Sequence, residues 1–249
     1  MKLILIILLI SYTMSVLIRH QHPNSMKKTI DYTKSGANWP GVCKSGARQS
    51  PIAIDKFNKI ETDILNVQYG KSEGKMNWNG SFFKIDVDDA NSKITFTDNK
   101  KKPAADIVYV LKRVIFRTPP EHIVEGKMHD LEIQLIHESE NKKETNNLLI
   151  VSILGKVTNE KKMYDDWWKN IEFDSKVKSS LEGINNAMFI LKEYVFYEGS
   201  QTVPNCVENV NWIVFKKPLL MDRHILNSFK KPFCDIEFDM SCRSFGIML

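Results

Sequence analysis

Short runs that alternate apolar and polar residues recur along the chain. Side chains at i and i+2 of a strand face the same side of a sheet, so each run predicts a strand with one buried face. The run at 148–154 is almost continuously apolar, which predicts a strand covered on both faces. The alternating runs, each bounded by Asn, Asp, Gly or Pro, are 82–87, 93–97, 131–136 and 212–215.

Helical patterns are few and short. The candidates are residues 165–171, 180–186 and 222–229. No linker rich in Gly, Ser or Pro interrupts the chain between Tyr32 and Phe233, and 249 residues with 43% hydrophobic content are enough to bury a full core. We therefore expect one mainly β domain over residues 19–249.

The N-terminus has the composition of a secretory signal peptide. Lys2 is followed by an apolar run at residues 3–10 and then by the small or polar residues Ser11, Thr13 and Ser15. The sequence predicts a removed segment at residues 1–18 and a secreted or lumenal protein. The alternative is a retained membrane anchor, because the apolar stretch extends with interruptions to Ile18.

Charge and cysteine content narrow the classes of function. The net charge of +5 arises from 35 basic and 30 acidic residues spread along the chain, without a basic stripe of interleaved aromatics, which argues against nucleic-acid binding. The cysteines are even in number and contain no C-x-x-C pair, which favours disulfides over a zinc knuckle and leaves three pairings open. They are Cys43, Cys206, Cys234 and Cys242.

Three motifs stand in order along the chain. Trp39 precedes a C-x-x-G-x-x-Q-S-P-I-x-I pattern at 43–54, the segment 113–137 reads RVIFRTPPEHIVEGKMHDLEIQLIH, and residues 199–214 read GSQTVPNCVENVNWIV. Together they resemble the α-carbonic anhydrase family. The resemblance implies that family's fold, with a large, mostly antiparallel central sheet, short peripheral helices and a conical cavity.

The resemblance also locates a metal site whose ligands are replaced. The family holds zinc with three histidines, two in an H-x-H pair on one strand and the third on another, and these places hold Ile115, Arg117 and Gln134. Isoleucine has no donor atom, arginine is always cationic, and glutamine offers zinc only a carbonyl oxygen. We therefore expect no zinc cofactor and a pseudoenzyme.

Other residues of the family's site persist. Glu121 and Thr202 match the pair in which a glutamate orients a threonine hydroxyl, and Glu132 matches the acid that steadies the third zinc histidine. His122 and His137 match structural histidines. Residual catalysis is one interpretation of these residues, and inherited hydrogen-bond structure, which the missing ligands favour, is the other.

The resemblance carries two further expectations. Extracellular members join the cysteines of the first and last motifs, here Cys43 and Cys206, which leaves Cys234 and Cys242 as a second disulfide or as two free thiols. Asn79-Gly80-Ser81 stands where the family commonly has N-G-H, so the proton-shuttle histidine is absent. The same residues form a glycosylation sequon at Asn79.

Three hypotheses of function remain. The leading one is a catalytically inactive carbonic-anhydrase-like module for binding or assembly with protein partners. In it Arg117 either holds a small anion or is neutralised internally by Glu121 or Glu132. The second is an accessory subunit of a membrane-associated complex, with membrane contact only if the N-terminal segment is retained. The third is an active carbonate dehydratase with an unrecognised zinc site.

Overall fold

The computed structural model describes most of the chain after residue 33. The described residues are 34, 36–55, 60–61, 64–70, 72–87, 91–160, 166–174, 178–181, 183–184 and 191–234. The chain divides into units 1–31 and 32–249, and all described residues belong to the second. The N-terminal 1–18 segment, the side chain of Cys234 and all of Cys242 lie outside this description. No helix within it is long and apolar enough to cross a membrane.

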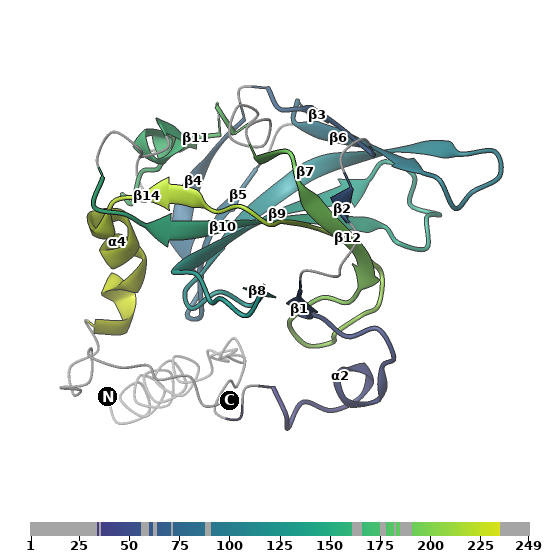
Figure 1. Ribbon diagram of the computed structural model, residues 1–249, viewed down its shortest axis with the longest axis horizontal. Helices are drawn as coiled ribbons and strands as arrows, with labels where there is room; N and C mark the ends of the chain where they lie inside the picture. The colour runs from purple at the N-terminus through teal and green to yellow at the C-terminus, as the bar shows by residue number, and fades with distance from the viewer. Residues whose placement is uncertain are drawn as a thin grey trace, which may run out of the picture. The chain divides into compact units, whose positions relative to one another are not determined.

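A large, mostly antiparallel sheet organises the fold (Figure 1), which confirms the mainly β class. Its pairs are antiparallel except β10 with β13 and β10 with β14. In order across the sheet, the strands are β11 (Lys178–Ser180), β4 (Glu73–Trp78), β5 (Phe83–Asp86), β7 (Ala105–Arg117), β9 (Leu131–Ser139), β10 (Leu148–Val157), β13 (Val210–Phe215), β12 (Tyr194–Gly199) and β2 (Ile60–Glu61).

Smaller elements complete the described part. Three further strands extend or flank the sheet, and a separate parallel pair lies in Figure 1 near α2. The helices are few and short. The further strands are β3 (Leu65–Gln68), β6 (Lys93–Asp98), which pairs with β3, and β14 (Leu219–Met221). The parallel pair consists of β1 (Ala53–Ile54) and β8 (Ile123–Val124). The helices are α2 (Val42–Ser45), the 3-10 helix η2 (Asp166–Asn170) and α4 (Arg223–Cys234).

Most of the predicted elements are present, with one exception. The strand predicted at 148–154 is buried on both faces, and residues 222–229 lie at the start of α4, where the Asp222 carboxylate accepts a hydrogen bond from the His224 N–H at 2.7 Å. The helix predicted at 180–186 is wrong at its start. Ser180 ends β11, which pairs with β4, so tertiary pairing overrides the local pattern there. Residues 185 and 186 lie outside the described part.

A bulge in β7 decides which side chains face the site. Leu111 pairs with His137 of β9, whereas Arg113 pairs with Ile136, so β7 advances two residues while β9 advances one. Because side chains alternate along a strand, the bulge moves the odd-numbered residues of β7 to the other face. Leu111 therefore faces the main core, and Ile115 faces the opposite side with Gln134.

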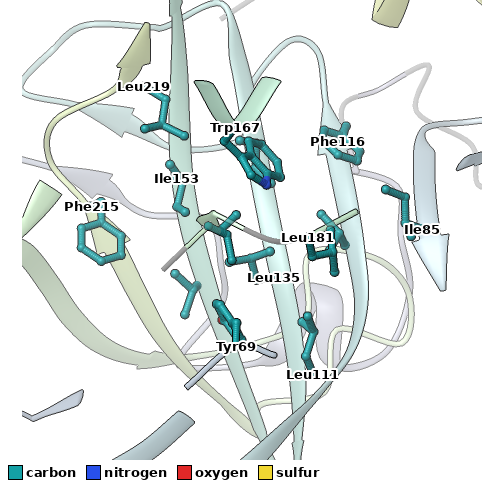
Figure 2. Packing of buried hydrophobic residues seen from close by; sticks show 14 of the residues in the cluster. Tyr69, Ile85, Leu111, Phe116, Leu135, Ile153, Trp167, Leu181, Phe215 and Leu219 are labelled. Carbon is teal, nitrogen blue, oxygen red and sulfur yellow. The ribbon is translucent and has the colours of Figure 1, made fainter. Parts of the chain in front are cut away.

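The main core fills one face of the sheet. Buried residues of β7, β9 and β10 contact η2, α4 and Leu181 there, and Figure 2 shows Trp167 above Ile153, Leu135 and Leu181. The opposite face carries two smaller apolar clusters, one around Leu154 and Val214 and one around Ile150 and Trp212. The candidate site lies on this second face, so the main core supports it from below.

Candidate functional site

The three residues that the resemblance places at the zinc ligands form a compact buried group. Ile115 of β7 pairs directly with Gln134 of β9, and Arg117 pairs with Glu132 two residues further along the strands. The side chains face the same side of the sheet because each pair is two residues from the next. Their exposed fractions are 5% for Ile115, 7% for Arg117 and 2% for Gln134. The fold therefore brings together the three residues that the resemblance selects.

Arg117 is held by an acid and by an aromatic ring. Its Nε lies 3.3 Å from Oε1 of Glu121, and its guanidinium carbon lies 4.0 Å from the centroid of the Phe82 ring. A guanidinium over an aromatic face gains a favourable electrostatic interaction, which increases when the pair is desolvated. Arg117 is thus charge-paired within the chain, as the internally neutralised alternative expects.

Gln134 contacts both acids of the site. Its Nε2 donates hydrogen bonds to Oε2 of Glu121 at 2.7 Å and to Oε1 of Glu132 at 3.1 Å. The two oxygens of Glu121 are therefore occupied by different partners, one by Gln134 and the other by Arg117. The amide of Gln134 thus turns its donor side toward the two carboxylates.

Glu132 is a fully buried carboxylate with many donors around it. Although burial alone would raise its pKa, the neighbouring His122 and the hydrogen bonds to the carboxylate hold the pKa of Glu132 well below its usual range. The charged form is thereby stabilised without a metal. Its donors are the backbone N–H groups of Glu121 and His122, His122 Nδ1, Ser152 Oγ and Gln134 Nε2, at 2.8 to 3.1 Å.

A buried hydrogen-bond chain continues from Glu132 to the N-terminal motif. His122 Nε2 lies 2.8 Å from the Tyr197 hydroxyl, which lies 3.2 Å from Ser50 Oγ. Ser50 and Ser200 then bond reciprocally, each hydroxyl accepting the other residue's backbone N–H. At Gly199 a Cβ atom would stand 2.2 Å from Ser50 Oγ, so glycine permits this close approach.

The first and last motifs are also joined covalently. Cys43 and Cys206 form the disulfide that the resemblance implied. Beside it, Gln49 Nε2 donates to Glu208 Oε1 at 2.9 Å, and the Arg48 N–H donates to the same oxygen at 2.6 Å. These contacts explain the two motifs as structural, because their polar residues bind each other.

Thr202 differs from the expected pairing. It lies half-buried in the loop after β12, and neither it nor any other described hydroxyl hydrogen-bonds Glu121. Instead Glu121 contacts Gln134 and Arg117. Two residues of the site belong to no motif and were not predicted. Phe82, in the turn before β5, contacts Arg117. Ser152 of β10, which pairs with Gln134 of β9, donates a hydrogen bond to Glu132.

The residues at this position do not fit zinc. Zinc in proteins takes thiolate, imidazole or carboxylate donors in tetrahedral geometry. Ile115 supplies no donor, Arg117 supplies a positive charge, and the Gln134 amide nitrogen is turned toward the acids. Among the described residues, no group of three or more His, Cys, Asp or Glu side chains is placed to hold a metal ion.

A cavity of about 220 Å³ lies elsewhere, toward the ends of β6, β7 and β12. Its lining includes Tyr109, whose pKa burial raises to about 12. Its charged groups bind each other, as in the ion pairs of Arg48 with Glu198 and of Lys101 with Glu144, both at 2.8 Å. This cavity shares none of the residues of the candidate site.

Comparison with known proteins decides the family. A model of the eukaryotic-type carbonic anhydrases matches residues 34–240. The chain belongs to this family. Relatives include dioscorin DB3L of Dioscorea polystachya, 28% identical over 186 residues, and the carbonic anhydrase of Neisseria gonorrhoeae, 24% identical over 178 residues. These alignments cover 71% and 70% of this chain, and 64% and 66% of the relatives' lengths.

Solved α-carbonic anhydrases share the fold. The enzyme of Thermovibrio ammonificans in complex with the inhibitor sulfanilamide matches with a TM-score of 0.60 and 25% identity, over 76% of this chain and 80% of that one. The Photobacterium profundum enzyme matches with a TM-score of 0.61 and 21% identity, over 80% and 86%. The α-carbonic anhydrase fold predicted from the motifs is thus confirmed. The chain spans about two thirds, 64%, of the dioscorin length.

Proposed function

We propose that this carbonic anhydrase-family protein is catalytically inactive and acts as a binding or assembly module. The observation that carries the proposal is the contact of Gln134 and Arg117 with Glu121, on the face where the resemblance places zinc. Hydration of CO2 in the family needs a metal-bound water whose pKa falls to about 7. A site with a guanidinium and no imidazole ligand cannot generate that nucleophile.

The substituted side chains take over the electrostatic role of the ion. Buried carboxylates are costly unless paired with charge or with several donors. Arg117 supplies the charge for Glu121, and Gln134 supplies an N–H donor to each acid. The site is therefore stable as a metal-free network, and Arg117 would oppose a divalent cation entering it.

The ion pair of Arg117 with Glu121 also bears on whether a small anion binds at Arg117. A small anion at Arg117 would have to compete with Glu121, which lies 3.3 Å from the guanidinium Nε. The pair supports the alternative in which Arg117 is neutralised within the chain. We therefore propose that protein partners bind outer surfaces of the domain and that the former zinc position serves only its stability.

The compartment is part of the proposal. A disulfide such as Cys43–Cys206 persists in oxidising surroundings, which supports a secretory or lumenal location. Sequencing the mature N-terminus distinguishes the two versions of this proposal. A start near residue 18 or later supports the secreted module, whereas a start at Met1 or Lys2 supports the anchored accessory subunit.

CO2 hydration by the purified chain tests the inactive assignment. Stopped-flow assays with added zinc are expected to give the uncatalysed rate. Hydration that rises with protein concentration and disappears with a chelator would establish the alternative of an active carbonate dehydratase. The Glu138→Ala variant, altered at an exposed position of β9, is the matched control for Gln134→Ala, and a contaminating enzyme would be unaffected by either substitution. Loss of catalysed hydration in Gln134→Ala but not in Glu138→Ala would assign the activity to this chain.

A further inference from the structure

The turn between β4 and β5 carries an exposed asparagine beside the candidate site. Asn79 is exposed, and its Oδ1 accepts hydrogen bonds from the backbone N–H groups of Ser81 at 3.0 Å and Phe82 at 2.9 Å. Backbone bonding continues between the Asn79 N–H and the Phe82 carbonyl at 3.2 Å. The turn is therefore fixed with the side chain of Asn79 at the surface.

The amide nitrogen of Asn79 is left outside these bonds. In a planar amide, Oδ1 and Nδ2 point in different directions, so an Oδ1 directed at the turn leaves Nδ2 away from those two N–H groups. Among the described residues no acceptor binds Nδ2. A substituent on Nδ2 would consequently break none of the turn's hydrogen bonds.

We propose that Asn79 carries an N-linked glycan. Asn79-Gly80-Ser81 is the only N-x-S/T match of the chain with a central residue other than proline. The donor would be an oligosaccharide attached to a lipid diphosphate. In the transfer, Nδ2 forms a bond to the sugar C1 as the C1–O bond to the diphosphate breaks, the amide loses a proton to a base of the transferase, and the lipid diphosphate leaves.

The modified turn lies at the edge of the substituted zinc position. Phe82, the last residue of the turn, lies over the guanidinium of Arg117. Because the glycan would be attached three residues before Phe82 and on the free side of the amide, the Phe82–Arg117 contact would remain. The glycan would keep the turn at the surface in any assembly, which directs partners to other faces of the domain.

Translation of the full chain with added microsomes tests the proposal. The wild-type chain is expected to show one glycan-sized mobility shift, removed by peptide N-glycosidase with conversion of Asn79 to Asp in the peptide mass spectrum. The shift should disappear in both Asn79→Gln and Ser81→Ala and persist in Ser81→Thr. Asn77→Gln is the matched control, since Asn77 is an exposed asparagine of the neighbouring strand outside any sequon.

Two results would overturn the assignment. One is a chain that enters the microsomes, is protected from added protease and migrates without a shift. The other is a chain that stays accessible to protease, because glycan transfer requires entry into the lumen. Both outcomes are independent of the CO2 assay, so the glycan and the inactive assignment can fail separately.

Discussion

Two groups of residues on one face of the sheet differ in how they compare with the family. The resemblance places the family's zinc ligands at Ile115, Arg117 and Gln134, which are not histidines. It also matches Glu132 and His122, called here the retained residues, to residues that surround the family's metal. The retained residues make several hydrogen bonds each, and Glu132 alone accepts from His122, Ser152, Gln134 and two backbone N–H groups. Such residues can be kept without metal chemistry, because they satisfy one another's buried polar groups.

The largest expected effect comes from the retained group. Replacing Glu132 with alanine leaves buried donors of His122 and Ser152 and two backbone N–H groups without their acceptor. We expect a loss of roughly 3–5 kcal/mol in the free energy of unfolding, measured by urea denaturation with the disulfide intact. Glu138→Ala, at an exposed position of the same strand, should change it by less than about 0.5 kcal/mol. Similar values for the two variants would show that Glu132 is not structural.

Substitution of Arg117 tests the new pairing. Arg117→Met leaves Glu121 half-buried with only Gln134 as a partner, so we expect a loss of roughly 2–3 kcal/mol in the free energy of unfolding. The double variant Arg117→Met with Glu121→Gln should recover much of that loss, because no unpaired charge remains. Strictly additive effects in this double-mutant cycle would mean that the two side chains are not coupled.

The retained histidine of the main core predicts a dependence on pH. Burial lowers the pKa of His137 to about 4, and its Nε2 lies 2.7 Å from the Tyr69 hydroxyl. Because the folded state resists protonation, the stabilisation present above the unfolded pKa of about 6.5 is lost as the pH falls toward 4. This linkage amounts to about 2 kcal/mol between pH 7 and pH 5.

Urea denaturation at several pH values measures the contribution of His137. His137→Gln should flatten the decline by that amount, since glutamine can donate to the Leu149 carbonyl and accept from Tyr69 but does not titrate. His129, whose pKa is also lowered by burial, remains in both proteins and so cancels in the comparison. An unchanged slope in the variant would assign the pH dependence to other groups.

Thr202 is expected to give the smallest effect. It makes no hydrogen bond with Glu121 in the described structure, and it is half-buried in a loop. Thr202→Ala should therefore change the free energy of unfolding by less than about 0.5 kcal/mol. A loss above 1.5 kcal/mol, on the order of a buried hydrogen bond, would show that the threonine still belongs to a cooperating pair.

Sequence reasoning was strongest where a pattern repeats. Alternation located the strands around Gln134 and Trp212, and the motifs located the Cys43–Cys206 disulfide. It failed at Ser180, where pairing with β4 decides the structure. For Arg117 the sequence offered Glu121 or Glu132 without choosing between them, because the placement of Arg117 depends on the bulge in β7 and that of Glu121 on the loop before β8. The hydrogen bond from Gln134 to Glu121 was not predicted.

Zinc titration against a chromogenic chelator measures whether the site around Gln134 and Arg117 binds the metal. It compares the native chain with the triple variant Ile115→His, Arg117→His and Gln134→His. The native chain is expected to take no zinc from the chelator. The variant should take about one equivalent, since it introduces three imidazoles beside Glu132, which the resemblance matches to the acid that supports the family's third histidine. Stoichiometric zinc in the native chain, lost on Gln134→Ala, would show that this site binds the metal and that Gln134 is one of its ligands.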